Sequence, residues 1–284
     1  MNKNEIKALI SLLEDPDHNI YFQVKNKLIE LGIEVIPDLE DAWEMNFDSL
    51  MQRRTEQIIH EIQLNFNLNE LNDWIESPEK DLLKAWLIIS RYQYPDLDTE
   101  NIELQIEQLI KEIWIELNNN LTALEKIKLI NHILFEVHEY KGNIRNFYAP
   151  ENSYVNDVLN NKKGSPLSLS LLYLIIAQKC ELSIQGVNLP KHFIIAYINE
   201  ELYTGDPIKF YINPFSQGTI LSRHDLESFL EKEKLELKTM FFSPCGNKTI
   251  IRRLLANLLQ SYSKNGNKEK AEEIQSFIQL FQNK

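Results

Sequence analysis

Apolar residues recur at helical spacing through the first half of the chain. Near the N-terminus, Ile6, Leu9, Ile10 and Leu13 follow the i, i+3, i+4 and i+7 positions that one face of a helix buries. Similar runs, with proline, glycine and aspartate at their ends, continue to about residue 136. The pattern predicts a series of helices over this half. We expect the four tryptophans, which all lie in these helices, to pack in the core.

The pattern changes near residue 141, where glycine, proline and asparagine become dense. A strongly apolar segment at 166–179 predicts a buried helix. Alternating segments rich in β-branched and aromatic residues predict strands at 184–189, 192–198, 201–205 and 208–212. Helical spacing returns at 223–232, 249–265 and 268–282. We expect an α+β fold that is predominantly helical, with a small antiparallel sheet.

Composition and charge narrow the function classes. The 284 residues include 30 Lys+Arg and 42 Asp+Glu, which gives a net charge of -12 and, without a basic stripe, argues against a nucleic-acid partner. The two cysteines, Cys180 and Cys245, cannot build a disulfide scaffold or a four-cysteine zinc site. His132 and His138 share no clear face, so we expect no metal and no cofactor.

Targeting signals do not stand out in the sequence. The N-terminus shows neither an uninterrupted apolar core nor a small-residue cleavage site, which argues against a signal peptide. The longest apolar stretch, 167–177, is interrupted by serines and is much shorter than a membrane span of about 20 residues. We therefore expect a cytoplasmic protein with no membrane partner.

The order of elements in the second half indicates where chemistry would lie. Ser165-Pro166 marks the start of the buried helix, His192 lies on a following strand and Asn213 ends a later one. A helix N-terminus offers free N–H groups and positive potential, which lower the pKa of a thiol and stabilise an oxyanion. A histidine on the adjoining sheet can take the proton, and a third polar residue can orient the imidazole.

Several short motifs along this half carry a family resemblance. They are Asn152-Ser153-Tyr154, Gly164-x-Pro166, the run GVNLPKHF at 186–193, and Pro214-Phe215 with Gly218. With these motifs, residues 80–284 resemble the SirB1 family, a branch of the transglutaminase-like superfamily. The resemblance implies a papain-like core with a small antiparallel sheet.

The resemblance divides the chain into three expected parts. Residues 1–78 form a helical region, in which 12–39 resemble a HEAT-type repeat through an Asp-Pro turn and a later Leu-Gly. Residues 79–246 form the transglutaminase-like core domain. Residues 247–284 form a helix pair that resembles a tetratricopeptide-like tail, with Asn257-Leu258 and Lys270-Ala271 as its matching positions.

The resemblance also implies an incomplete catalytic site. The superfamily places its nucleophilic cysteine at the start of the helix that here reads GSPLSLS, where this chain has no cysteine. His192 matches the catalytic histidine, and Asn213 stands where the family pattern reads aspartate. Ser168, His192 and Asn213 would then be the remnant triad positions. Four further residues are expected to line the cleft: Asn152, Tyr154, Ser165 and Pro166.

Each of these residues also has a structural interpretation. Ser165 can be a helix N-cap with Pro166 at the first helical position, and Ser168 can bond back to the helix. His192 can be a structural histidine bonded to Asn213, with Asp206 as an alternative acidic partner. Two loop residues, Asn152 and Tyr154, can tie the loop down instead of lining a cleft.

Two functions remain open at this point. The first is a non-catalytic protein that binds a protein or peptide partner, or has a regulatory role. It is favoured by the missing thiol and by the helical-repeat-like ends. The alternative is a hydrolase or acyl-transferase that uses Ser168, His192 and Asn213. It requires a serine hydroxyl within hydrogen-bond reach of the imidazole.

Overall fold

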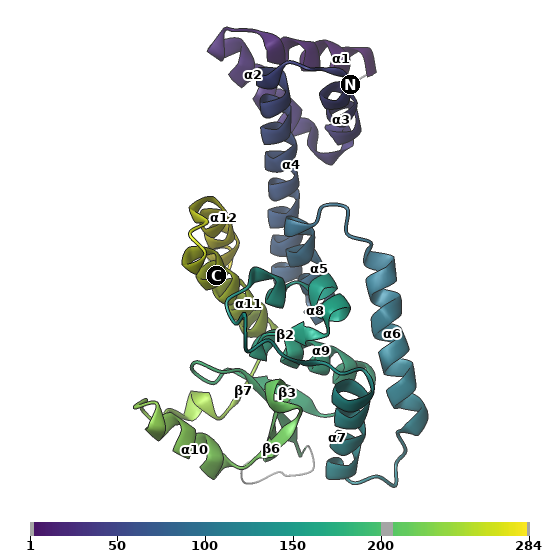
Figure 1. Ribbon diagram of the computed structural model, residues 1–284, viewed down its shortest axis with the longest axis vertical. Coiled ribbons are helices and arrows are strands. Elements are labelled where there is room, and N and C mark those ends of the chain that lie inside the picture. Colours follow the sequence, from purple (N-terminus) through teal and green to yellow (C-terminus); the bar gives the residue numbers. More distant parts are fainter. Residues whose placement is uncertain (1–2, 200–206, 283–284) are drawn as a thin grey trace. The chain divides into compact units, whose positions relative to one another are not determined.

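The computed structural model describes residues 3–199 and 207–282 (Figure 1). The chain forms two compact units, one made of Met1–Asp73 with Arg91–Pro95 and the other of Trp74–Ser90 with Asp96–Lys284. The boundaries between the units fall inside two helices, α4 (Ser49–Glu76) and α5 (Leu82–Gln93).

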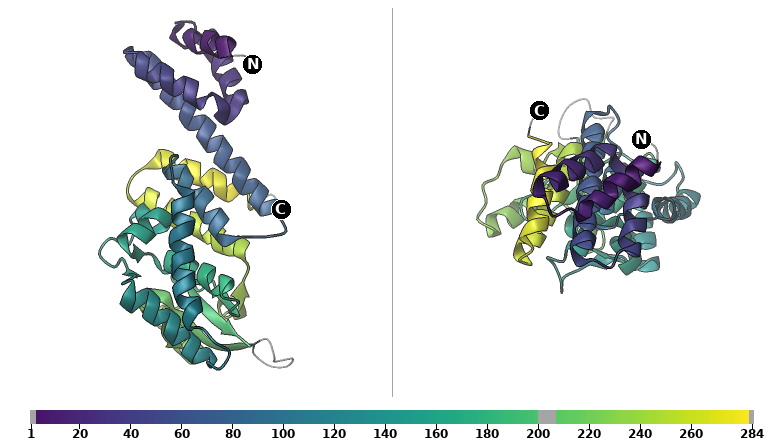
Figure 2. Two further views of the ribbon diagram at one scale, coloured as in Figure 1. Left: turned by 90° about the vertical axis from the view of Figure 1, so that its right-hand side faces the viewer. Right: turned by 90° about the horizontal axis from the view of Figure 1, so that it is seen from above.

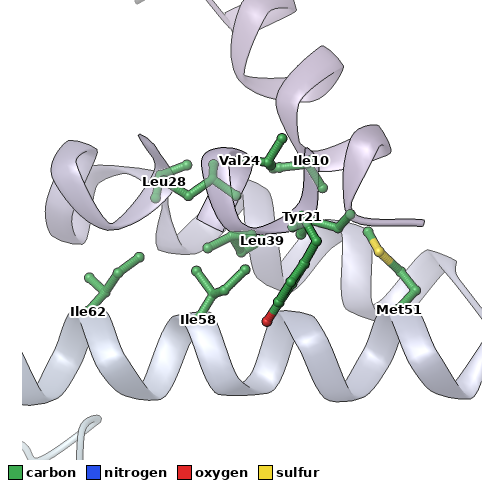
Figure 3. Packing of buried hydrophobic residues seen from close by; sticks show 10 residues of the cluster. Ile10, Tyr21, Val24, Leu28, Leu39, Met51, Ile58 and Ile62 are labelled. Carbon is green, nitrogen blue, oxygen red and sulfur yellow. The ribbon is translucent and has the colours of Figure 1, made fainter. Parts of the chain in front are cut away.

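The first unit is helical. Its elements are α1 (Lys3–Ser11), the 3-10 helix η1 (Leu12–Glu14), α2 (His18–Leu31), η2 (Gly32–Val35), α3 (Ile36–Met45) and most of α4. Apolar side chains from these helices pack on one face of α4 (Figure 3). Met51, Ile58 and Ile62 lie on that face and pack with Leu28 of α2 and Leu39 of α3. All five are buried, and burial of each side chain of this size contributes roughly 1.5–3 kcal/mol.

The second unit begins with helices and continues into a sheet. Its helices are the greater part of α5, then α6 (Thr99–Glu116), α7 (Ala123–Asn131), the π-helix η3 (His132–Val137), the 3-10 helix η4 (Pro150–Ser153), α8 (Val155–Asn161), α9 (Pro166–Lys179), η5 (Pro214–Ser216), α10 (Arg223–Lys232), η6 (Thr239–Phe241), α11 (Asn247–Lys264) and α12 (Lys268–Gln279). Its strands are β1 (Lys141–Gly142), β2 (Lys163–Gly164), β3 (Ile184–Val187), β4 (Ile194–Ile198), β5 (Ile208–Asn213), β6 (Thr219–Leu221) and β7 (Pro244–Cys245).

The five-stranded sheet has the order β6-β5-β4-β3-β7, with antiparallel neighbours throughout. α9 packs on β3 and β4 (Figure 1). Ile194 and Ala196 of β4 belong instead to a cluster with Leu226 and Leu230 of α10. Because side chains alternate along a strand, Ile195 points to the opposite face. The sheet therefore lies between α9 and α10.

α9 is the central helix of this unit. From Pro166 to Ala177 every residue of α9 is buried, as expected for a helix that is apolar all round. α6 packs on α8 and α9 and runs along one side of the unit (Figure 2), while α11 packs on α9 and pairs with α12. These neighbours enclose α9 and leave only its ends near the surface.

The predicted fold class is confirmed: the chain is mostly helical with a small antiparallel sheet. The predicted strand at 201–205 lies outside the described residues. Within residues 3–199 and 207–282, no helix combines the length and apolar character that crossing a membrane requires. The predicted boundaries at 78 and 246, and the repeat-like character of the two ends, stay predictions.

The expectation for the tryptophans is wrong for two of the four. Trp74 and Trp86 are buried, but Trp43 and Trp114 are 37% and 66% exposed. Helical spacing places a residue on one face of a helix but does not say whether another element covers that face.

Candidate functional site

The start of α9 is held by the predicted cap. Ser165 is the N-cap residue, and Pro166 follows in the first turn. Ser165 Oγ accepts the backbone N–H of Ser168 at 3.1 Å, and Ser168 Oγ accepts the backbone N–H of Ser165 at 2.8 Å. This reciprocal pair is a capping box. The N-cap interpretation of Ser165 is therefore confirmed.

The hydroxyl of Ser168 is enclosed by this cap. The Ser168 side chain is 0% exposed, and its Oγ lies 3.1 Å from Ser165 Oγ. Gly164 leaves the space for it, since a Cβ on Gly164 would come within 2.6 Å of Ser168 Oγ. The Ser168 hydroxyl thus caps the helix. Ser168 does not line the pocket described below.

The predicted strand at 192–198 begins only at Ile194, so His192 lies in the turn between β3 and β4, where it is bonded to the end of β5. Its Nε2 is 3.2 Å from Oδ1 of Asn213, the last residue of that strand. An amide oxygen only accepts, so Nε2 carries the hydrogen and Nδ1 keeps its lone pair. The ring of Phe215 meets the imidazole edge-on, with centroids 6.0 Å apart. The predicted pairing of His192 with Asn213 is therefore present.

The protonation of His192 follows from its surroundings. Burial lowers the pKa of His192, the hydrogen bond to Asn213 raises it, and the nearby positive charge of Arg253 lowers it further. The net effect is a pKa below the ordinary value, so the imidazole is neutral at pH 7. Asp206, the alternative acidic partner, lies outside the described residues.

A pocket of about 520 Å³ lies beside the start of α9. Ser165, Pro166 and Leu167 line it together with His192 and Phe193. α11 contributes polar side chains at helical spacing, namely Arg253, Asn257, Gln260 and Ser261. Of the predicted site residues, the structure brings four into this pocket, Asn152, Ser165, Pro166 and His192, whereas Ser168, Tyr154 and Asn213 do not line it.

The pocket holds cationic groups. Arg253 is half-buried, and its Nη1 donates to Asn188 Oδ1 at 3.1 Å. Lys191 Nζ lies 2.7 Å from Glu233 Oε2 and is neutralised by it. Among the described residues that line the pocket, none is Asp or Glu. The local charge is therefore positive, although the whole chain is acidic.

Asn152 shapes the loop that forms the pocket rim. Its Oδ1 accepts from Asn143 Nδ2 at 2.8 Å, and its Nδ2 donates to the carbonyls of Asn146 and Phe147 at 2.7 and 3.1 Å. The side chain is buried and also lines the pocket, so Asn152 both ties the loop down and lines the cleft. Tyr154 is buried away from the pocket, with its hydroxyl 2.6 Å from that of Tyr262 on α11.

The two cysteines lie away from the start of α9. Cys180 is the C-cap residue of that helix, and burial raises the pKa of its thiol. Burial also raises the pKa of Cys245, on β7, to about 11. A raised pKa leaves little thiolate at pH 7, so neither thiol is an activated nucleophile.

The remaining candidate ligands are dispersed. His132 lies 2.8 Å from Glu136, and His138 lies 2.6 Å from Glu112 of α6. The hydrogen bond from His138 lowers the pKa of Glu112. In the part of the chain that the structure describes, no group of three or more His, Cys, Asp or Glu side chains is placed to hold a metal ion.

Comparison with known families agrees with this architecture. The family described as Transglutaminase-like superfamily matches residues 100–256, which include α9, His192 and Asn213. The chain belongs to the transglutaminase-like superfamily. The matched segment covers more than half of the chain and contains the pocket residues from Phe147 to Arg253.

Several proteins are similar to this transglutaminase-like chain. A UPF0162 protein of Xylella fastidiosa (strain Temecula1) is 28% identical over 191 residues, which are 64% of this chain and 65% of that protein. A UPF0162 protein of Vibrio cholerae is 26% identical over 182 residues, 63% of this chain and 65% of its own length. F-box only protein 21 of Mus musculus is 24% identical over 251 residues, 79% of this chain and 40% of that protein. No solved structure matches the chain.

Sequence reasoning missed the contribution of α11 to this transglutaminase-like site. Arg253, Asn257, Gln260 and Ser261 lie at i, i+4, i+7 and i+8, a polar stripe along one face of the helix. An arginine on such a stripe, beside an apolar face that is buried, can indicate from the sequence that the stripe lines a binding site. Only the structure, however, shows that the stripe lines the pocket at the start of α9.

Proposed function

We propose that the chain is a non-catalytic transglutaminase-like protein that binds a protein or peptide segment in the pocket at the start of α9. The observation that carries this proposal is the capping box of Ser165 and Ser168. It occupies the place where the superfamily resemblance expects a nucleophilic thiol. We also assign the chain to the SirB1 branch, on its sequence motifs.

The first helical turn of α9 is poorly equipped for acyl transfer. Pro166 has no backbone N–H, and the N–H of Ser168 is bonded to Ser165 Oγ. An oxyanion hole needs preorganised donors aimed at the developing charge, and the cap has already engaged one of them. The enclosed Ser168 hydroxyl lacks the access that a nucleophile requires.

The pocket retains properties suited to binding. Its volume of about 520 Å³ falls within the range of roughly 300–1,000 Å³ that is usual for ligand sites. Apolar walls from Pro166, Leu167 and Phe193 accompany polar groups from Asn257 and His192. Such a combination of apolar surface with a few convergent polar groups suits a peptide segment.

The pairing of His192 with Asn213 favours the alternative, a serine hydrolase or acyl-transferase. The imidazole is neutral and oriented, as a general base must be. This alternative requires Ser168 to leave the cap and reach His192. Leaving the cap costs about 1 kcal/mol, and Ser168 would also have to become exposed.

Site-specific photo-crosslinking in cells tests the binding role. A benzophenone amino acid at Tyr148, on the pocket rim, should give covalent adducts with a partner protein or peptide, and His192→Ala should weaken them. The matched control places the crosslinker at Val137, which is 58% exposed and does not line this pocket. Equal adducts from both positions, or none from Tyr148, would contradict the proposal.

A further inference from the structure

Arg253 is a charged residue of the pocket whose guanidinium has no anionic counter-ion among the described residues. Its side chain reaches the pocket from α11, and its Nη1 donates to the neutral side chain of Asn188 at 3.1 Å. Within residues 3–199 and 207–282, no Asp or Glu forms an ion pair with it. Burial lowers the pKa of the guanidinium, which nevertheless stays charged at neutral pH. A half-buried charge without a counter-ion is costly, and a bound anion would remove that cost.

The other titratable groups at the pocket do not provide a counter-ion for Arg253. Glu233 lies outside the lining and is paired with Lys191 at 2.7 Å. His192 is neutral at pH 7, because burial and Arg253 both lower its pKa. The lining therefore carries one uncompensated positive charge among the described residues. A single arginine in the lining suits a carboxylate, whereas phosphate recognition commonly uses clusters of arginines.

The rim of the pocket adds apolar surface beside this charge. Phe147 and Tyr148 line the pocket and are 41% and 38% exposed, with their rings in edge-to-face contact at 5.2 Å. Lys264, which is solvent-exposed, lies over the Tyr148 ring at 3.3 Å from its centroid. An occupant that joins an apolar side chain to a carboxylate would satisfy both features.

We propose that the pocket binds a carboxylate group carried by a peptide, with Arg253 as its partner and the aromatic rim of Phe147 and Tyr148 receiving a neighbouring apolar side chain. A guanidinium presents two parallel N–H donors that match the two oxygens of a carboxylate. The carboxylate is either the C-terminus of a chain or an acidic side chain. This inference rests on the proposed binding role of the pocket and names the chemistry of its ligand.

Short peptides can test the carboxylate requirement on the unmodified protein. The probes are acetyl-glycyl-phenylalanine with a free carboxylate and the same compound as its amide. Amide and arginine side-chain NMR resonances of the full chain would report binding at Leu167 and Arg253. We expect the free carboxylate to bind at least about tenfold more tightly than the amide, the size of one charge-assisted contact.

A third probe distinguishes the two sources of the carboxylate. Acetyl-glutamyl-phenylalanine amide carries its carboxylate on a side chain and has a blocked C-terminus. If it binds as tightly as the free dipeptide, a side-chain carboxylate suffices. If it binds no better than acetyl-glycyl-phenylalanine amide, the site recognises the carboxylate of a C-terminus. Either result supports the proposal, whereas binding of inorganic phosphate in preference to both carboxylates would overturn it.

Two arginine variants locate the interaction. Arg253→Gln should reduce the affinity for the free carboxylate to that for the amide. Arg252→Gln should leave it unchanged, because the adjacent Arg252 is exposed and does not line the pocket. If Arg253→Gln fails to fold, the comparison of carboxylate with amide on the unmodified chain still decides the question.

The outcomes separate this inference from the proposed function. Equal affinity for carboxylate and amide, or equal loss from both arginine variants, would overturn the carboxylate assignment. Pocket-specific crosslinking at Tyr148 would still support a binding role in that case. Conversely, carboxylate binding without a crosslinked partner would leave the small-ligand chemistry intact and contradict a macromolecular partner.

Discussion

The two ends of α9 differ in the groups that surround them. At the N-terminal end, a pocket, a neutral histidine and an arginine surround a helix start that is capped by Ser165. At the C-terminal end stands Cys180, a thiol whose pKa is raised by burial. A 14-residue helix separates them by about 20 Å. The pocket with its histidine thus lies at one end of the helix, while the thiol lies at the other.

The reactivity of a thiol as a nucleophile therefore depends on where it lies along the helix, and the number of cysteines in the chain does not determine it. Partial positive charge at a helix N-terminus stabilises a thiolate, and partial negative charge at the C-terminus disfavours it. Variants that change the surroundings of the pocket end, measured beside Cys180 or another matched control, test this contrast.

The largest effect is expected when a thiol is moved to the pocket end. In a Pro166→Cys variant, the new thiol should be alkylated by iodoacetamide at pH 7 about 100-fold faster than Cys180. The helix N-terminus lowers the pKa of one thiol, whereas burial raises that of the other. Peptide mapping by mass spectrometry follows both thiols in the same molecules.

The same variant tests the contribution of His192. Adding His192→Ala should slow alkylation of the new thiol and leave Cys180 unchanged, because His192 lines the pocket at the start of α9. Cys245 provides a second internal control, since burial raises its pKa to about 11. Similar alkylation rates for the new thiol and Cys180 would show that the pocket end does not activate a thiol.

A smaller effect is expected on stability. Ser165→Ala removes the acceptor of the Ser168 N–H at 3.1 Å and should lower the free energy of unfolding by about 1–2 kcal/mol. Cys180→Ala, at the opposite end, should lower it by less than about 1 kcal/mol, since that side chain is only partly buried and the C-cap hydrogen bonds of Cys180 come from its backbone N–H, which alanine keeps. Urea denaturation followed by circular dichroism measures both, and equal losses would argue against a capping role.

The smallest effect concerns the protonation of His192. An NMR titration should give a pKa below about 6.5, the ordinary value, and Arg253→Gln should raise it. Because the folded-state pKa is lowered, His192 contributes stability that is fully present above pH 6.5 and is lost as the pH falls below it. Arg252→Gln is the matched control, and an equal rise there would exclude a specific effect of Arg253.

Local signals in the sequence predicted much of this arrangement. Ser165-Pro166 preceded a long apolar run, and the observed α9 begins and ends at the predicted residues. The alternation of apolar residues placed Asn213 at the end of one strand and His192 at the start of another, so antiparallel pairing predicted that the two lie close together. In the structure that strand begins only at Ile194, but the two side chains are still bonded. These features depend on neighbouring residues or on one sheet.

Features that depend on packing between segments far apart in the sequence were not predicted. Arg253 lies some 60 residues beyond His192 in the chain, and only the docking of α11 on α9 brings the two into one pocket. Ser168 and Ser165 have the same side chain within one turn, yet only Ser165 lines that pocket. The exposure of Trp43 and Trp114 likewise depends on which helix faces remain uncovered.

Binding without catalysis is the role that we propose for the pocket at the start of α9. Its most direct test treats the purified chain with a fluorophosphonate probe and maps any adduct by mass spectrometry, beside the His192→Ala variant. We expect no adduct on Ser165 or Ser168, because the cap holds both hydroxyls. An adduct on Ser168 that disappears in His192→Ala would contradict it and establish a serine enzyme.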